Sequence, residues 1–180
     1  MRKRRTALWT ATAFGVVLAL LVVVLATRDP ATDRVVKSPL LGKQAPATSG
    51  TTIDGEEFDL ADLEGQWVLV NFLASWCVPC QREHDDLKQF DEVHAATRDA
   101  SVISVVFEDD VRAVRAYFEE RGGDWPVVRD DNGALAVAWG VPRVPESYLV
   151  APNGLVVLKV SGEVTYAGIE QRLEELRSRV

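Results

Sequence analysis

The chain has 180 residues, of which 47% are hydrophobic and 26% charged, and its formal net charge is −7 at pH 7. Every charge before residue 29 is basic, so residues 29–180 carry 15 basic against 27 acidic side chains, or −12. A surface this acidic repels phosphate backbones, which excludes nucleic acid as the main partner. The remaining length, about 150 residues, fits a single domain with its own core.

Residues 7–26 form an uncharged, mostly apolar run near the beginning of the chain. As a helix it would extend about 30 Å, the thickness of the hydrocarbon layer of a bilayer, so it predicts a single transmembrane signal-anchor. Residues 1–6 carry four basic side chains, which predicts a cytoplasmic N-terminus and a domain outside the cytoplasm. The alternative is a cleaved secretory signal, because residues 24–26 would suit a signal peptidase. We favour the anchor, because the run is longer than the core of a typical signal.

The stretch after this run carries Pro30, Pro39 and Pro46 among scattered charges and has little apolar periodicity. Such a composition is typical of a tether. We therefore assign residues 27–44 to a linker and residues 45–180 to the extracytoplasmic domain.

Within the domain, the predicted elements follow one another in a clear order. Ile53-Asp54-Gly55 predicts a hairpin turn, residues 67–73 a strand buried on both faces, and residues 79–97 an amphipathic helix. Next come a strand at 102–107, a helix that begins at Val111 and ends at Gly122-Gly123, and a short helix at 135–139. The last elements are two strands, 147–150 and 155–160, which a hairpin joins, and a helix that carries Ile169 and Leu173. This order predicts an α/β protein whose central mixed sheet is covered by helices on both faces, which is the order of a thioredoxin-like fold.

The two cysteines of the chain, Cys77 and Cys80, stand where the buried strand gives way to the amphipathic helix. A thiol at a helix N-terminus meets the positive end of the helix dipole, which stabilises the thiolate and lowers the thiol pKa. We predict that Cys77, just ahead of the first turn, is the more reactive. Pro79 suits the first turn, where its missing N–H costs no hydrogen bond. The pair is therefore predicted to be a redox-active disulfide.

Two other roles for the pair are less favoured. A structural disulfide is common in exported proteins, but one that closes so short a loop adds little stability. Cys77, Cys80 and His84 could instead bind zinc or copper. The sequence contains no second Cys-x-x-Cys knuckle of the kind that usually completes a zinc site.

Three segments of the sequence resemble a known family. Residues 71–80, Asn-Phe-Leu-Ala-Ser-Trp-Cys-Val-Pro-Cys, resemble the active-site stretch of thioredoxin-like proteins. Residues 140–150 resemble the segment that carries the cis-proline of that superfamily, and residues 41–46 resemble the opening of its membrane-tethered branch. The most similar group is the TlpA, ResA and DsbE (CcmG) family of membrane-anchored thiol-disulfide oxidoreductases in the bacterial cell envelope.

This resemblance implies an enzyme, a thiol:disulfide oxidoreductase of the protein-disulfide reductase type. Its redox centre would be the Cys77–Cys80 disulfide, with no metal and no other cofactor. Pro145 would be cis and lie beside the cysteines. The backbone of Val144 could then pair with an extended substrate peptide.

Further site residues come from the same resemblance. Cytoplasmic thioredoxins bury an aspartate where this sequence has Asn71, which cannot accept a proton from the second thiol at neutral pH. In the tethered branch an acid three residues after the second cysteine takes a similar place, which makes Glu83 the candidate catalytic acid or base; the alternative is a solvated charge. Glu146 matches the Pro-Glu pair of DsbE-like proteins. Trp76 is predicted to lie at the rim of the site. Trp76 and Pro79 are both predicted to belong to the substrate-binding surface.

The predicted reaction begins when the Cys77 thiolate attacks a substrate disulfide, and it ends when Cys80 resolves the mixed disulfide. The resemblance implies a reductase of exported proteins whose substrate is apocytochrome c during cytochrome c maturation and whose electrons come from a membrane protein. Two alternatives stay open. One is a disulfide-forming oxidase, and the other is a copper metallochaperone or binding module that uses Cys77, Cys80 and His84.

Overall fold

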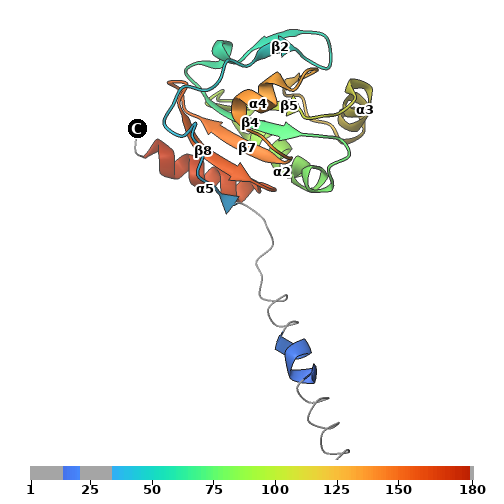
Figure 1. The fold of residues 1–180 in the computed structure, drawn as a ribbon. Coiled ribbons are helices and arrows are strands. Elements are labelled where there is room, and N and C mark those ends of the chain that lie inside the picture. Colours follow the sequence, from blue (N-terminus) through green and yellow to red (C-terminus); the bar gives the residue numbers. More distant parts are fainter. Residues whose placement is uncertain (1–13, 21–33, 179–180) are drawn as a thin grey trace, which may run out of the picture. The chain divides into compact units, whose positions relative to one another are not determined.

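The computed structural model describes residues 14–20 and 34–178, in two units that comprise residues 1–30 and 31–180 (Figure 1). Residues 14–20 are helical, and the rest of the predicted membrane segment 7–26 lies outside the described residues, as do residues 1–6. Among the helices of the described ranges, none has both the length and the apolar character needed to cross a bilayer. The membrane anchor therefore stays a prediction.

The domain is built on a central mixed sheet, as predicted. The sheet has six strands in the order β1-β8-β7-β4-β5-β6. Its strands are β1 (Arg34–Val35), β4 (Trp67–Leu73), β5 (Ala100–Val106), β6 (Val127–Val128), β7 (Glu146–Val150) and β8 (Val156–Ser161). The central strand β4 runs parallel to β5 and antiparallel to β7. Every residue of β4 is buried, because helices and loops cover both of its faces.

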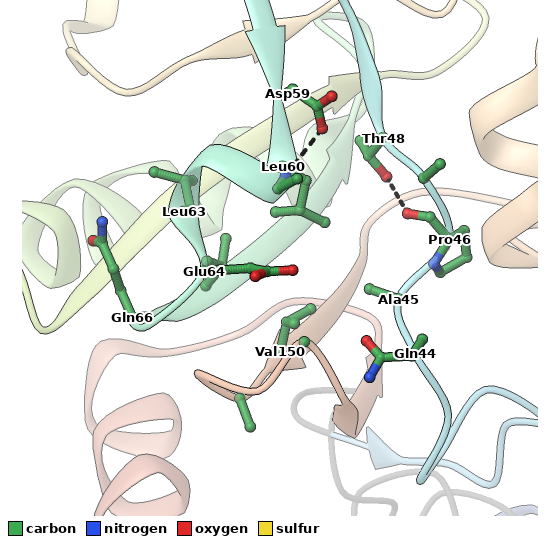
Figure 2. Close-up of a pocket in the computed structure, with 15 residues that line it drawn as sticks. Gln44, Ala45, Pro46, Thr48, Asp59, Leu60, Leu63, Glu64, Gln66 and Val150 are labelled. Carbon is green, nitrogen blue, oxygen red and sulfur yellow. Dashed lines mark hydrogen bonds between the residues drawn. The ribbon is translucent and has the colours of Figure 1, made fainter.

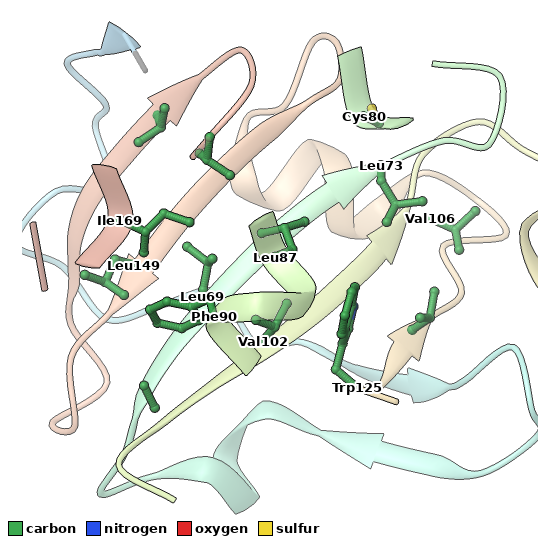
Figure 3. Close-up of a cluster of buried hydrophobic side chains, with 14 of the residues drawn as sticks. Leu69, Leu73, Cys80, Leu87, Phe90, Val102, Val106, Trp125, Leu149 and Ile169 are labelled. Atoms are coloured by element: carbon green, nitrogen blue, oxygen red, sulfur yellow. The ribbon is translucent and has the colours of Figure 1, made fainter. Parts of the chain in front are cut away.

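Three helices cover one face of the sheet: α2 (Val78–Ala95), α3 (Val111–Arg121) and α5 (Tyr166–Arg177). Figure 3 shows this core, in which Leu87 and Phe90 of α2 and Ile169 of α5 surround Leu69 of β4. Cys80 belongs to the same cluster. The first turn of α2, which carries the cysteines, is thus anchored in the larger of the two cores.

The other face is covered by the short helix α4 (Ala134–Trp139), the 3-10 helix η1 (Leu60–Leu63) and the hairpin of β2 (Ser49–Thr51) and β3 (Glu57–Asp59). Phe72 of β4, Trp139 of α4 and Tyr148 of β7 form the centre of this second core, with ring centroids 4.9–6.2 Å apart. The predicted helices and strands of the domain are all present, with ends shifted by a few residues.

Residues 34–44, which the sequence analysis assigned to the linker, lie against the domain. β1 pairs antiparallel with β8, the backbone N–H of Gly42 donates to the carbonyl oxygen of Val156 at 2.8 Å, and the N–H of Val156 donates to the carbonyl oxygen of Lys43 at 2.9 Å. The pairing covers an outer edge of the sheet that would otherwise expose unpaired backbone groups. A strand of two residues has no periodicity that a sequence pattern can reveal.

Candidate active site

The cysteines lie in the turn between β4 and α2, as predicted. Cys77 is the N-cap of α2, and its Sγ accepts a hydrogen bond from the backbone N–H of Cys80 at 3.2 Å. Pro79 occupies the first turn of the helix. The two cysteines form a disulfide, and each is 3% exposed. The sulfur of Cys77 thus meets a helix N-terminal N–H and the positive end of the helix dipole, and we expect both to stabilise a thiolate once the disulfide is reduced.

The peptide bond between Val144 and Pro145 is cis, which confirms the expectation for this proline. Pro145 stands directly before β7, whose first residue, Glu146, pairs with Phe72 near the end of β4. This register places Pro145 beside the C-terminal end of β4, from which the chain enters the cysteine turn. The half-buried Val144 packs against both cores. Pairing of the Val144 backbone with a substrate remains a prediction.

Glu83 is 1% exposed, so the alternative of a solvated charge is wrong. It stands three residues after Cys80 on the buried side of α2. Its Oε1 accepts a hydrogen bond from Asn71 Nδ2 at 2.8 Å, and its Oε2 accepts one from the backbone N–H of Val164 at 2.8 Å. A carboxyl group held this firmly near the second cysteine can exchange a proton with it, either directly or through a water molecule.

Asn71 makes a second hydrogen bond, from Nδ2 to the hydroxyl oxygen of Ser147 at 3.0 Å. Ser147 of β7 lies directly opposite Asn71 in the sheet, and both residues are fully buried. Sequence reasoning singled out Asn71 only as a departure from the thioredoxin pattern, and it missed Ser147. The available signal was a small hydroxyl side chain in a strand that is otherwise apolar from residue 148 onward except for the Tyr148 hydroxyl.

Glu146 points to the opposite side of β7 from Ser147, because side chains alternate along a strand. It is 3% exposed, and its Oε2 lies 2.8 Å from Nζ of the buried Lys159. Ser161 donates a hydrogen bond to Glu146 Oε1 at 3.2 Å. Burial by itself would lower the pKa of Lys159, but the contacts with Glu146 and Tyr148 raise it above its ordinary value. Lys159 is therefore cationic and forms an ion pair with Glu146. The sequence analysis did not predict Lys159 as the partner of Glu146.

Trp76 is 57% exposed and lies at the tip of the turn, next to Cys77. Its Nε1–H donates to the carbonyl oxygen of Glu108 at 3.3 Å, and the N–H of Ser75 donates to Asp109 Oδ2 at 2.6 Å. These contacts fix the turn to the loop after β5. The exposed indole next to the cysteine pair agrees with the predicted position of Trp76 at the rim, whereas Trp67, Trp125 and Trp139 are core residues.

His84, a ligand in the metal-binding alternative, is engaged elsewhere. Its Nε2 lies 2.9 Å from the carbonyl oxygen of Gly122, and its ring packs against Tyr117, Phe118 and Trp125. Burial lowers the pKa of His84, although the bond to Gly122 partly opposes this effect. In the described part of the chain, no three His, Cys, Asp or Glu side chains are gathered in a way that could hold a metal ion.

A cavity of about 250 Å³ lies elsewhere on the domain (Figure 2). It is lined by residues between Gln44 and Thr48, by Leu60 and Leu63 of η1, and by Val150. Gln66 and Val68 also line it, at the start of β4, whereas the cysteines follow the other end of this strand. The cavity is therefore separate from the cysteine site.

Comparisons with known proteins agree with this geometry. The model of the Redoxin family matches residues 40–179. The thiol-disulfide oxidoreductase ResA of Bacillus thuringiensis subsp. konkukian is 28% identical over 138 residues, which cover 76% of this chain and 78% of that protein. The thiol:disulfide interchange protein CycY of Rhizobium leguminosarum bv. viciae is 32% identical over 114 residues, which cover 63% of this chain and 59% of that protein. A crystal structure of a thioredoxin family thiol:disulfide interchange protein from Chlorobium tepidum TLS superposes with a TM-score of 0.68 at 25% identity and covers 78% of this chain and 98% of that one.

Proposed function

This chain belongs to the Redoxin family, in its thioredoxin-like ResA and DsbE branch, and from this premise we propose that it reduces disulfide bonds in exported proteins. It is a thiol-disulfide oxidoreductase whose redox centre is the Cys77–Cys80 pair. The observation that carries the proposal is the position of Cys77 as the N-cap of α2, with the Cys80 N–H directed at its sulfur. A sulfur in this position is suited to attack as a thiolate.

The reaction has two exchanges, each of which breaks one S–S bond and forms another. In the first, the Cys77 thiolate attacks a substrate disulfide, which forms a mixed disulfide and releases one substrate thiolate. In the second, Cys80 gives up its proton, with Glu83 as the acceptor, and attacks Cys77 Sγ. The second substrate thiolate leaves, so the substrate is reduced by two electrons and the enzyme becomes the disulfide.

The proposed setting is the outer face of a bacterial cell membrane, with residues 7–26 as the anchor. A tether confines the domain near membrane-bound partners and so raises their effective concentration. One partner would be a membrane protein that returns two electrons to the cysteine pair. The other would be the substrate, for which apocytochrome c is the candidate that the motif resemblance implies.

A second candidate function is the reverse reaction, the formation of disulfides. The same N–H bond to Cys77 Sγ favours it, because stabilising the thiolate stabilises the reduced enzyme and makes the pair a stronger oxidant. The reduction potential separates the two directions. A value of about −270 mV supports the reductase, and a value of about −120 mV supports the oxidase.

Trapping of the substrate tests the proposed function. The Cys80→Ala variant of the full chain should accumulate a mixed disulfide through Cys77, because the resolving thiol is missing. We expect the trapped proteins to be exported ones that carry the Cys-x-x-Cys-His haem-attachment motif. The double variant Cys77→Ala/Cys80→Ala is the matched control and should capture none of them. A broad mixture of exported proteins without that motif would instead indicate a general disulfide catalyst.

A further inference from the structure

Three buried polar side chains are joined by hydrogen bonds across three elements: Glu83 on α2, Asn71 on β4 and Ser147 on β7. They are 1%, 0% and 0% exposed. Asn71 lies in the middle, because its Nδ2 is 2.8 Å from Glu83 Oε1 and 3.0 Å from Ser147 Oγ. We call these three residues the buried polar row. Groups buried this deeply have no bulk water as an alternative partner, so the hydrogen bonds within the row affect which charge states its members can adopt.

The nitrogen of the Asn71 amide is the atom that faces Glu83. An ionised carboxylate can only accept hydrogen bonds, whereas a carboxamide has two N–H donors and one acceptor oxygen. Asn71 Nδ2 donates to Glu83 Oε1 and also to Ser147 Oγ. Both donors of the amide are therefore used, and one of them is committed to the carboxylate.

This orientation of the amide is fixed by its surroundings. Oδ1 of Asn71 is buried and has no hydrogen-bond partner among the described residues. If the amide turned over, both N–H groups would lie where Oδ1 now lies, and two buried donors would lose their acceptors. Unsatisfied buried donors are costly, whereas the present orientation leaves only the acceptor of the amide without a partner. Asn71 is thus a donor that stays directed at Glu83.

The carboxyl group of Glu83 receives a hydrogen bond on each of its oxygens. Asn71 donates to Oε1, and the backbone N–H of Val164 donates to Oε2 at 2.8 Å. Burial by itself disfavours a charged carboxyl group, whereas donated hydrogen bonds favour the charge. Of these two donors only Asn71 is a side chain, so it is the one that a substitution can remove.

We propose that Asn71 is a positioning residue for the second exchange: as a fixed hydrogen-bond donor it keeps Glu83 in the carboxylate form, in which Glu83 can accept the proton of Cys80. The proposal rests on the proposed role of Glu83 as proton acceptor. The S–H bond of Cys80 breaks, its proton goes to a carboxylate oxygen of Glu83, and the sulfur keeps the electron pair with which it attacks Cys77 Sγ. Asn71 takes no part in these bond changes and acts only through Glu83.

Removal of this donor has a predictable direction. Leucine is close to asparagine in shape but has no N–H, so in Asn71→Leu the carboxylate form of Glu83 loses a charge-assisted hydrogen bond. The protonated form loses less, because a hydrogen bond to a neutral group is weaker. Glu83 should therefore stay protonated to a higher pH. The pH above which it can accept the proton of Cys80 should rise by at least about one unit.

The reaction of the reduced, detergent-solubilised full chain with 5,5′-dithiobis(2-nitrobenzoate) isolates this step. Attack by Cys77 releases one coloured thiolate, and attack by Cys80 on the resulting mixed disulfide releases a second in a unimolecular phase. We expect the pH midpoint of that second phase to rise by at least about one unit in Asn71→Leu. A midpoint within about 0.3 unit of wild type overturns the role of Asn71.

Ser104→Ala is the matched control for the loss of a buried polar group. Ser104 lies opposite Asn71, on β5, and is fully buried, but its hydroxyl accepts from Trp125 Nε1. The pH midpoint of the second phase in Ser104→Ala should remain that of wild type. A shift equal to that of Asn71→Leu would show that the effect is not specific to the donor at Asn71, and it overturns the proposal.

Glu83→Gln separates the role of Asn71 from that of Glu83. If Glu83→Gln leaves the pH profile of the second phase unchanged, the proposed role of Glu83 fails, and the role of Asn71 fails with it. If Glu83→Gln alters the profile and Asn71→Leu does not, the role of Glu83 stands and only the role of Asn71 fails.

A measurement on the wild-type chain keeps the proposal testable should Asn71→Leu fail to fold. The infrared difference spectrum between the oxidised wild-type chain and oxidised Glu83→Gln reports the charge of Glu83, because a carboxylate and a protonated carboxyl group absorb at different frequencies. At pH 7 we expect Glu83 to contribute carboxylate bands only. A band of a protonated carboxyl group from Glu83 at that pH overturns the proposal.

Discussion

Replacement of Cys77 with serine should lower the rate of disulfide reduction by at least about a thousandfold, because a serine hydroxyl is not ionised near neutral pH and an alcohol is a far weaker nucleophile than a thiolate. Serine is close to cysteine in shape, so the turn between β4 and α2 should keep its conformation. Turnover of insulin disulfides by the reduced protein measures the effect. A Cys77→Ser variant with more than about a tenth of wild-type turnover would contradict the assignment of Cys77 as the nucleophile.

The Cys80→Ser variant is the control for this loss. It keeps the thiol of Cys77 at the helix N-terminus, so it should still form a mixed disulfide with a substrate but should not complete the turnover. With 5,5′-dithiobis(2-nitrobenzoate) it should release one coloured thiolate per protein rather than two. Loss of the first release in Cys80→Ser would mean that Cys80, and not Cys77, makes the initial attack.

Replacement of Lys159 with methionine should lower the free energy of unfolding by about 3–5 kcal/mol at pH 7. Lys159 Nζ lies 2.8 Å from Glu146 Oε2, and the exposed fractions of the two side chains are 10% and 4%. Methionine fills much of the same space but leaves the carboxylate of Glu146 buried without its counter-charge, and the remaining bond from Ser161 compensates only part of this. Urea unfolding measures the difference.

Two further variants separate the ion pair from general packing. Glu146→Gln/Lys159→Met removes both charges and should recover most of the loss, since an uncharged pair carries no desolvation penalty of that size. Arg172→Met breaks the ion pair with Glu175, whose members are 47% and 41% exposed, and should cost no more than about 1 kcal/mol. Equal losses in Lys159→Met and Arg172→Met would contradict a stabilising role for the buried pair.

The elements around the cysteines could be predicted from the sequence because each has a strong local signal. The apolar run 67–73, the amphipathic pattern after it and the Cys-x-x-Cys between them together predict a strand, a helix and the junction that carries the thiols. The cis form of Pro145 was expected from motif resemblance alone, since an ordinary Val-Pro bond favours trans.

The partners of the site residues could not be predicted, because they depend on how the strands are paired. Lys159 reaches Glu146 only because β7 and β8 pair so that Tyr148 lies opposite Lys159 and Glu146 opposite Ser161. The bond between Asn71 and Ser147 depends in the same way on the pairing of β4 with β7. No local pattern specifies these registers. The direction of the Glu146 side chain could have been found, since alternation along β7 separates it from Ser147.

The central claim is that the first cysteine of the pair is held as a thiolate by the N-terminus of α2. The rate of alkylation by iodoacetamide, measured against pH in the reduced Cys80→Ala protein, tests it most directly. The reference is an unstructured peptide of residues 71–83 with the same substitution. We predict a midpoint at least about one pH unit below the value of about 8.5 that is usual for a free thiol, and faster alkylation at pH 7 than in the peptide. A midpoint and a rate equal to those of the peptide would contradict the claim.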